Sequence, residues 1–239
     1  MAKTVDRVIR TTYRMNRSTP QSAGASQTTI GITDLMTSLA VVFILLFAAQ
    51  ITQTSSAAQT ELQENKEDVQ TALQDHIRRL GLSLDADPRD PLALVIVVPE
   101  HRLTFEFGKS TLSPAADQFL ADALPFYVGA LCGPLRSKID SFTIEGHTDN
   151  LGSDAFNLKL SQERSLAVMV KGLEVIHTAE PDSYHCFQEI TSASGRGRQD
   201  LIYESSDIVN REKSRRVIFK IRLRSAEQRH LVESPTNPL

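Results

Sequence analysis

The stretch Ile144–Arg164 has the sequence IEGHTDNLGSDAFNLKLSQER, and its two halves differ in local character. The first half continues the segment Ile139–Glu145, which is typical of a strand and breaks at Gly146 into polar residues. The second half begins a helical pattern that extends from Leu158 to about Val175. A strand, a polar turn and an amphipathic helix in this order predict a sheet with a helix packed on it.

The segments on either side supply further strands and a second helix. Leu92–Val98 (LALVIVV) is rich in β-branched residues and predicts a buried strand. Ser113 and Pro114 predict a helix start, because serine is a good N-cap and proline fits the first helical position. We therefore expect an α+β domain over residues 92–224, a βαβαβ sandwich with helices on a mixed sheet. The other predicted strands are Arg102–Phe107, Ile190–Ala193 and Arg216–Leu223.

The N-terminal part has a segregated charge pattern. Residues 1–29 form a basic tail with the acid Asp6 as its one negative charge, and residues 30–52 are apolar apart from Asp34. A helix of about 20 apolar residues spans a bilayer, so we expect a transmembrane helix at 30–52. Because basic residues stay in the cytoplasm, the N-terminus is expected inside the bacterial inner membrane and the C-terminal domain in the periplasm. A cleaved signal peptide is the alternative.

Residues 53–91 are expected to form a periplasmic linker helix, and residues 225–239 a C-terminal tail. Apolar residues recur at helical spacing through the linker. This stripe predicts pairing with a second copy of the chain, contact with the membrane surface, or packing on the following domain. The run Asp85–Pro91 predicts the end of the helix, because it contains two prolines. The stripe consists of Leu62, Val69, Leu73, Ile77, Leu80 and Leu84.

The sequence contains none of the usual arrangements for catalysis. It has no glycine-rich phosphate loop, no Ser/His/Asp order and no Cys/His pair, so we expect no enzyme activity and no direct binding of nucleic acid. His147 beside Glu145 offers two ligands at most, too few for a zinc site, so we expect a structural turn histidine and no metal.

Two cysteines, Cys132 and Cys186, lie in the part of the chain expected to be exported. An oxidising compartment allows disulfides to persist, so the two residues are candidates for a disulfide. Two separately buried thiols are the alternative, since the sequence gives no distance between them.

The central stretch resembles the OmpA-like peptidoglycan-binding domains. Their Gly-His-Thr-Asp turn matches residues 146–149, and their Asn-x-x-Leu-Ser-x-x-Arg helix start matches residues 157–164. The resemblance covers about residues 92–224. It implies that Asp149 binds the ammonium and Arg164 the carboxylate of a diamino acid in the stem peptide, with Thr148, Asn157 and Leu158 shaping the rim.

The chemistry of these two residues fits those roles. A guanidinium grips a carboxylate with two parallel hydrogen bonds, which an ammonium group cannot do. The alternative is structural: Asp149 caps the turn and pairs with Arg164.

Asp34 lies in the segment Gly31–Ser38 at the start of the apolar helix. An aspartate inside a membrane span is costly and marks a candidate functional site, whereas near the helix entry it can serve as an N-cap.

A single helix with this aspartate, followed by an OmpA-like domain, is similar to the B subunits of ion-driven stator units. These include the flagellar MotB type and the ZorB type of the Zorya anti-phage defence system. The resemblance implies a homodimer inside a ring of multi-pass A subunits, with Asp34 translocating protons or sodium ions and no other cofactor. Compact length, a short spacer and the sequence Ile32-Thr33 before Asp34 favour the defence type. A passive tether between membrane and wall is a further alternative.

Overall fold

The structure is a computed structural model that describes residues 25–106, 108–205, 207–225 and 228. The side chains of residues 25–34, 54 and 55 lie outside this description. Most of the predicted basic tail and most of the predicted C-terminal tail also lie outside it. The chain divides into two compact parts, residues 1–54 and 55–239, and each is considered by itself.

Helix α1 (Ala25–Arg79) contains the whole apolar segment and continues through much of the predicted linker. In the first part of the chain its large apolar side chains, from Leu35 to Ile51, are all more than half exposed. Among the described residues, α1 is the one helix whose length and composition suffice to cross a membrane.

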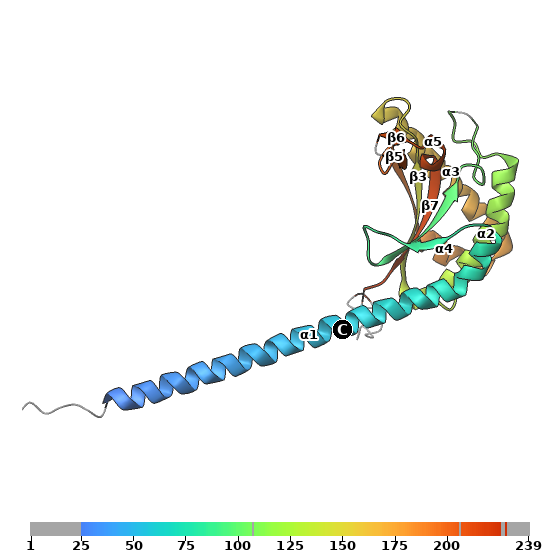
Figure 1. The fold of residues 1–239 in the computed structure, drawn as a ribbon. Helices are drawn as coiled ribbons and strands as arrows, with labels where there is room; N and C mark the ends of the chain where they lie inside the picture. The colour runs from blue at the N-terminus through green and yellow to red at the C-terminus, as the bar shows by residue number, and fades with distance from the viewer. Residues whose placement is uncertain (1–24, 107, 206, 226–227, 229–239) are drawn as a thin grey trace, which may run out of the picture. The chain divides into compact units, whose positions relative to one another are not determined.

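The second part is built on a five-stranded mixed sheet (Figure 1). Its strand order is β1-β2-β7-β3-β4, in which β3 and β4 are parallel and every other neighbouring pair is antiparallel. The predicted fold class, a mixed α and β domain after an apolar helix, is therefore confirmed. The strands are β1 (Leu84–Ala86), β2 (Ala93–Pro99), β3 (Ile139–His147), β4 (Thr191–Gly197) and β7 (Arg216–Leu223), and a separate hairpin joins β5 (Tyr203–Ser205) to β6 (Ile208–Val209).

Helices pack on the sheet and enclose the core. Ser113 caps α2 as predicted, since its hydroxyl accepts a hydrogen bond from the Ala116 amide at 3.2 Å. Aromatic rings fill the space between helices and sheet, among them Tyr127, Phe142 and Phe219, which are fully buried. The helices are α2 (Pro114–Cys132), α3 (Asp154–Ala179), α4 (Tyr184–Ile190) and the short α5 (Arg211–Ser214), with 3-10 turns at Arg136–Lys138 and Pro181–Ser183.

The C-terminal end of α1 packs on this domain. Val69, Leu73 and Ile77 are at most 1% exposed and belong to the same hydrophobic core as the sheet. Of the three possibilities for the apolar stripe, the structure shows packing on the domain for these residues. The helix ends before Asp85–Pro91, because Gly81 adopts φ +70° there.

Two backbone hydrogen bonds close this helix end. The amide of Leu82 bonds the carbonyl of Ile77, and that of Gly81 bonds the carbonyl of Arg78, as in a Schellman motif. The chain then enters β1, which pairs with β2.

Several predicted elements differ from the structure. Strand β3 continues to His147, and β4 runs from Thr191 to Gly197 and not from Ile190 to Ala193. The segment Arg102–Phe107 was expected as a strand, but it turns back on Pro99, whose carbonyl accepts the amides of both Arg102 and Leu103. The described residues of this segment form only one isolated β-bridge, between Phe105 and Leu112. Helix α3, which carries Arg164, begins at Asp154 and not at the predicted Leu158, because the hydroxyl of Ser153 caps it.

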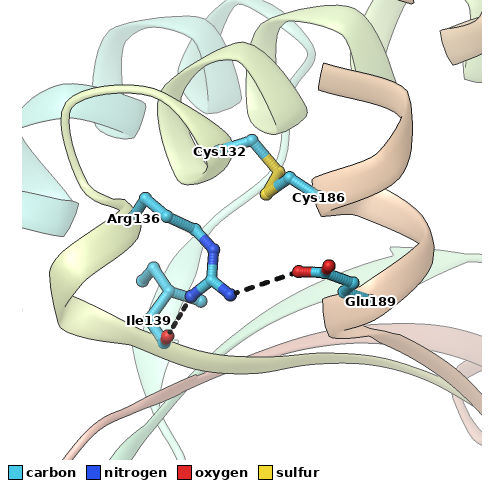
Figure 2. The surroundings of a disulfide bond; sticks show 5 residues. All are labelled: Cys132, Arg136, Ile139, Cys186 and Glu189. Atoms are coloured by element: carbon cyan, nitrogen blue, oxygen red, sulfur yellow. Dashed lines mark hydrogen bonds and ion pairs between the residues drawn. A yellow bond between two sulfur atoms is a disulfide. The ribbon is translucent and has the colours of Figure 1, made fainter. Parts of the chain in front are cut away.

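A disulfide joins Cys132 at the end of α2 to Cys186 in α4 (Figure 2). The Cα atoms lie 5.8 Å apart, and 54 positions separate the two residues in sequence. Arg136 beside it donates to the carbonyl of Ile139 at 3.1 Å and lies 3.8 Å from the carboxylate of Glu189. Cross-links that close long loops stabilise a fold mainly by restricting the unfolded chain.

Helix α3 lies unusually close to the sheet at two paired glycines, Gly146 on β3 and Gly195 on β4. A Cβ atom at Gly146 would overlap the backbone carbonyl of Ser161, and one at Gly195 would overlap the backbone of Gln162. The Gln162 side chain also covers the outer edge of β4, because it accepts from the Gly195 amide at 2.7 Å and donates to the Ala193 carbonyl at 3.3 Å.

We predict that Gly146→Ala destabilises the domain by about 1–3 kcal/mol or more, because the helix must move away from the sheet. Gly129→Ala is the matched control. Gly129 lies inside α2 with no atom within 4 Å of the added Cβ, so this change should stabilise by about 0.5–1 kcal/mol. Urea unfolding of the full chain in detergent measures both, and equal effects of the two substitutions would contradict the proposed close contact.

Candidate functional site

A cavity of about 480 Å³ opens where β3 ends and α3 begins. Its size lies within the usual range for small-ligand pockets. The walls come from the segment after β2, the loop after β3, the first turns of α3 and the residue before β7. The lining residues are Glu100, Phe105, Gly108, Thr148, Asp149, Leu151, Phe156, Asn157, Leu160, Arg164 and Arg215.

Asp149 lies two residues after the end of β3 and is 8% exposed. Its Oδ1 accepts a hydrogen bond from the Leu151 amide at 2.9 Å, which fixes the turn. Its Oδ2 accepts from Nη1 of Arg215 at 2.8 Å, and Nε of Arg215 donates to Glu100 at 2.6 Å. Arg215 therefore bridges two carboxylates at the cavity wall.

Arg164 comes from α3 and is also 8% exposed. Its Nε donates to the carbonyl of Lys109 at 3.0 Å, and the guanidinium lies 4.8 Å from the centre of the Phe105 ring. Burial lowers the pKa of Arg164, and the neighbouring charge of Arg215 adds to this effect. Among the described residues, the two terminal nitrogens of Arg164 have no hydrogen-bond acceptor, so they can serve a ligand.

The structural interpretation of these two residues, in which Asp149 caps its turn and pairs with Arg164, therefore holds only in part. Asp149 does cap its turn, but its ion-pair partner is Arg215 and not Arg164. The cavity holds two carboxylates and two guanidinium groups, from Glu100, Asp149, Arg164 and Arg215. Such a balanced wall suits a ligand that carries both signs of charge.

The three predicted rim residues lie in different settings. Thr148 lines the cavity, and its hydroxyl is buried with no partner among the described residues. Asn157 lines it too and donates to the Leu151 carbonyl at 2.7 Å, which holds the loop after β3 in place. Leu158 is about half exposed and is not part of the lining, because it faces away from the side of α3 that carries Asn157 and Leu160.

Sequence reasoning assigned no role to Arg215 or Glu100. Arg215 was visible as the first of two arginines before a buried strand, which is a weak signal on its own. Glu100 gave no signal, because its part in the site depends on the pairing of β2 with β7.

His147 is buried behind the cavity, 2% exposed. Its Nδ1 lies 3.2 Å from the Gln199 carbonyl, which can only accept, so this nitrogen carries the hydrogen. Its Nε2 is 3.9 Å from the Glu145 carboxylate and has no hydrogen-bond partner among the described residues. Burial, with the charge of Arg216, lowers the pKa of His147 to about 4. No group of three metal-ligating side chains occurs in the described part of the chain.

Sequence comparisons relate part of the chain to a known family. A sequence model of the OmpA family matches residues 104–215. Outer membrane protein P5 of Haemophilus influenzae is 42% identical over 66 residues, which are 28% of this chain and 17% of that protein. The chain thus spans less than a fifth of the length of this relative.

Two solved structures align with parts of the chain. A MotB-like protein from Desulfovibrio vulgaris aligns with a TM-score of 0.47 at 23% identity, over 69% of this chain and 96% of that one. The cell wall anchor of the T6SS from Pseudomonas aeruginosa aligns with a TM-score of 0.43 at 18% identity, over 65% and 97% of the two chains. The match to the OmpA family model marks residues 104–215 as an OmpA-like domain, which follows in the sequence an apolar helix long enough to cross a membrane.

We predict that His147 makes stability depend on pH. In the unfolded chain its pKa is near 6.5, and in the folded domain it is about 4, so the unfolded state binds the extra proton between these values. The contribution of His147 to stability should be complete above about pH 6.5 and should be lost, by roughly 3 kcal/mol, as the pH drops toward about 4.

Urea unfolding at pH 7.5, 6, 5 and 4 measures this dependence. The variant His147→Gln should lose it, whereas His101→Gln, an exposed control, should keep it. An unchanged slope in His147→Gln would show that another group is responsible.

Proposed function

We propose that this chain is a membrane-anchored protein whose OmpA-like domain binds the stem peptide of peptidoglycan. The carrying observation is the pair of opposite charges across one cavity: the guanidinium of Arg164 with open terminal nitrogens, and the carboxylate of Asp149 held by Leu151 and Arg215. The match of residues 104–215 to the OmpA family supports this assignment.

The ligand chemistry follows from these two groups. A diaminopimelate side chain ends in an ammonium and a carboxylate on one carbon atom. Arg164 can grip the carboxylate with two hydrogen bonds, and Asp149 can accept from the ammonium. Both protein groups are nearly buried, so their charges are only weakly screened by water. A lysine side chain, which lacks the carboxylate, would leave Arg164 unpaired.

We predict that the full chain in detergent binds a tripeptide with diaminopimelate at its third position more tightly than the lysine tripeptide, by about tenfold or more. Arg164→Lys should remove most of this preference, because an ammonium cannot make the double hydrogen bond. Asp149→Asn should weaken binding of both peptides. Isothermal titration calorimetry measures the affinities.

Arg136→Lys is the matched control for these variants. Arg136 is a partly buried arginine, more exposed than Arg164, that lies beside the disulfide and outside the cavity lining. The Arg136→Lys variant should bind both peptides with the affinity of the natural chain. Equal affinity of the natural chain for the two tripeptides would refute the role assigned to Arg164.

We further propose that the chain is the B subunit of an ion-driven stator unit, with Asp34 as the ion-carrying residue. Asp34 falls within the backbone span of α1, near the start of its apolar part. Ionised, an aspartate is costly in lipid and seeks polar partners on a neighbouring subunit, whereas neutralised by a proton or sodium ion it is not. The membrane potential supplies about 2.3 kcal/mol per charge per 100 mV to drive this alternation.

In this proposal two copies of the chain sit inside a ring of multi-pass A subunits in the inner membrane, with the N-terminus in the cytoplasm. Wall binding in the periplasm holds the B subunits still, so that the ring can turn against them. The sequence before Asp34 favours a Zorya-type defence complex over a flagellar MotB-type stator. A passive tether needs the same anchor and cavity but no ionisable group at position 34.

We predict that Asp34→Asn abolishes ion flux through the complex reconstituted in liposomes with its multi-pass partner, while stem-peptide binding stays unchanged. Asp34→Glu, which keeps an ionisable group, should retain measurable flux. A pH-sensitive or sodium-sensitive dye inside the liposomes reports the flux and identifies the ion. Full flux in Asp34→Asn would leave the tether as the correct function.

A further inference from the structure

We infer that a second hollow, beside the peptide cavity, binds the glycan backbone of the same polymer; this inference rests on the proposed function. The hollow is an open groove of about 460 Å³ under the β5–β6 hairpin, here called the hairpin groove. It lies outside the residues singled out from the sequence. Its lining residues are Asn150, Glu204, Asp207, Ile208, Val209, Asn210 and Arg211.

The hairpin groove adjoins the peptide cavity through the loop after β3. Asn150 lines the groove, while its chain neighbours Asp149 and Leu151 line the cavity. A stem peptide joins its sugar through its first residue, and each extended residue spans at most about 3.6 Å. With a third-position diamino acid at Asp149, the sugar must lie within roughly 10–15 Å, a span that includes the adjoining groove.

The chemistry of the groove suits an N-acetylated amino sugar. Five of its seven lining residues carry amide, carboxylate or guanidinium groups, which can donate to and accept from ring hydroxyls and acetamido groups. Ile208 is 60% exposed and offers an aliphatic surface for the apolar face of a sugar ring. A protein partner or a second copy of the chain would need a broader apolar surface than this one.

Hydrogen bonds hold this groove in a fixed shape. Arg211 donates through Nε to Asn150 at 3.0 Å, which ties the hairpin side to the loop after β3. The side-chain amide of Asn210 donates to Glu204 at 2.8 Å, and the backbone amide of Asn210 donates to the Ile202 carbonyl at 2.8 Å. Among the described residues, the terminal nitrogens of Arg211 and the amide nitrogen of Asn150 have no partner, so they remain available to a ligand.

The test compares two ligands of the full chain in detergent: the diaminopimelate tripeptide alone, and the same tripeptide on its N-acetylglucosamine–N-acetylmuramic acid disaccharide. The natural chain should bind the sugar-bearing ligand about tenfold more tightly. Ile208→Ser and Glu204→Ala should each reduce this gain to about twofold or less and leave the affinity for the bare tripeptide unchanged. Leu166→Ser, an exposed apolar residue of α3 outside the groove, is the control and should keep the gain.

The outcomes separate the two proposals. If the bare tripeptide binds and the disaccharide adds nothing, or if Ile208→Ser and Glu204→Ala keep the full gain, the groove does not bind glycan and only this inference fails. If the bare tripeptide does not bind at all, the proposed wall-binding function fails and the inference fails with it.

Discussion

The close contact of α3 with β3 and β4 is the constraint on which the rest of the domain depends. It exists because two paired strand positions, Gly146 and Gly195, have no side chain where the helix backbone passes. Ser161 and Gln162 touch the sheet at this point, so Arg164, less than one turn further along α3, lines the same cavity as Asp149. The cavity and its two opposite charges are thus a result of backbone packing.

The charged groups of the cavity are arranged so that one of them, the guanidinium of Arg164, stays available to a ligand. Arg215 is shared between Asp149 and Glu100, while the described residues hold Arg164 only through Nε and by the ring of Phe105. Binding a carboxylate there would replace water on a partly dehydrated cation, and the fixed position of the guanidinium limits the entropy lost on binding. The site is therefore prepared for an anionic group before any ligand arrives.

Much of this could be predicted from local sequence, and the rest depends on contacts between distant segments. The strand before Asp149 and the helix that carries Arg164 follow from short-range signals, although β3 continues to His147 and α3 begins four residues earlier than predicted, at Asp154. The role of Arg215 could not be predicted, because it pairs with a residue 66 positions away in the chain. Likewise, alternation in Arg102–Phe107 suggested a strand, but the turn onto Pro99 prevents regular pairing. The end of α1 was predicted from the two prolines of Asp85–Pro91, whereas Gly81, with φ +70°, ends the helix before them.

Gln162, which covers the outer edge of β4, affects how neighbouring copies of the domain behave when they lie side by side. Proteins confined to a surface meet one another at a high effective concentration, and an uncovered strand edge is a template for unwanted pairing between chains. Gln162 occupies both a donor and an acceptor of that edge with a single amide. A crowded layer of these domains can therefore stay unaggregated without a charged or proline-rich border on its last strand.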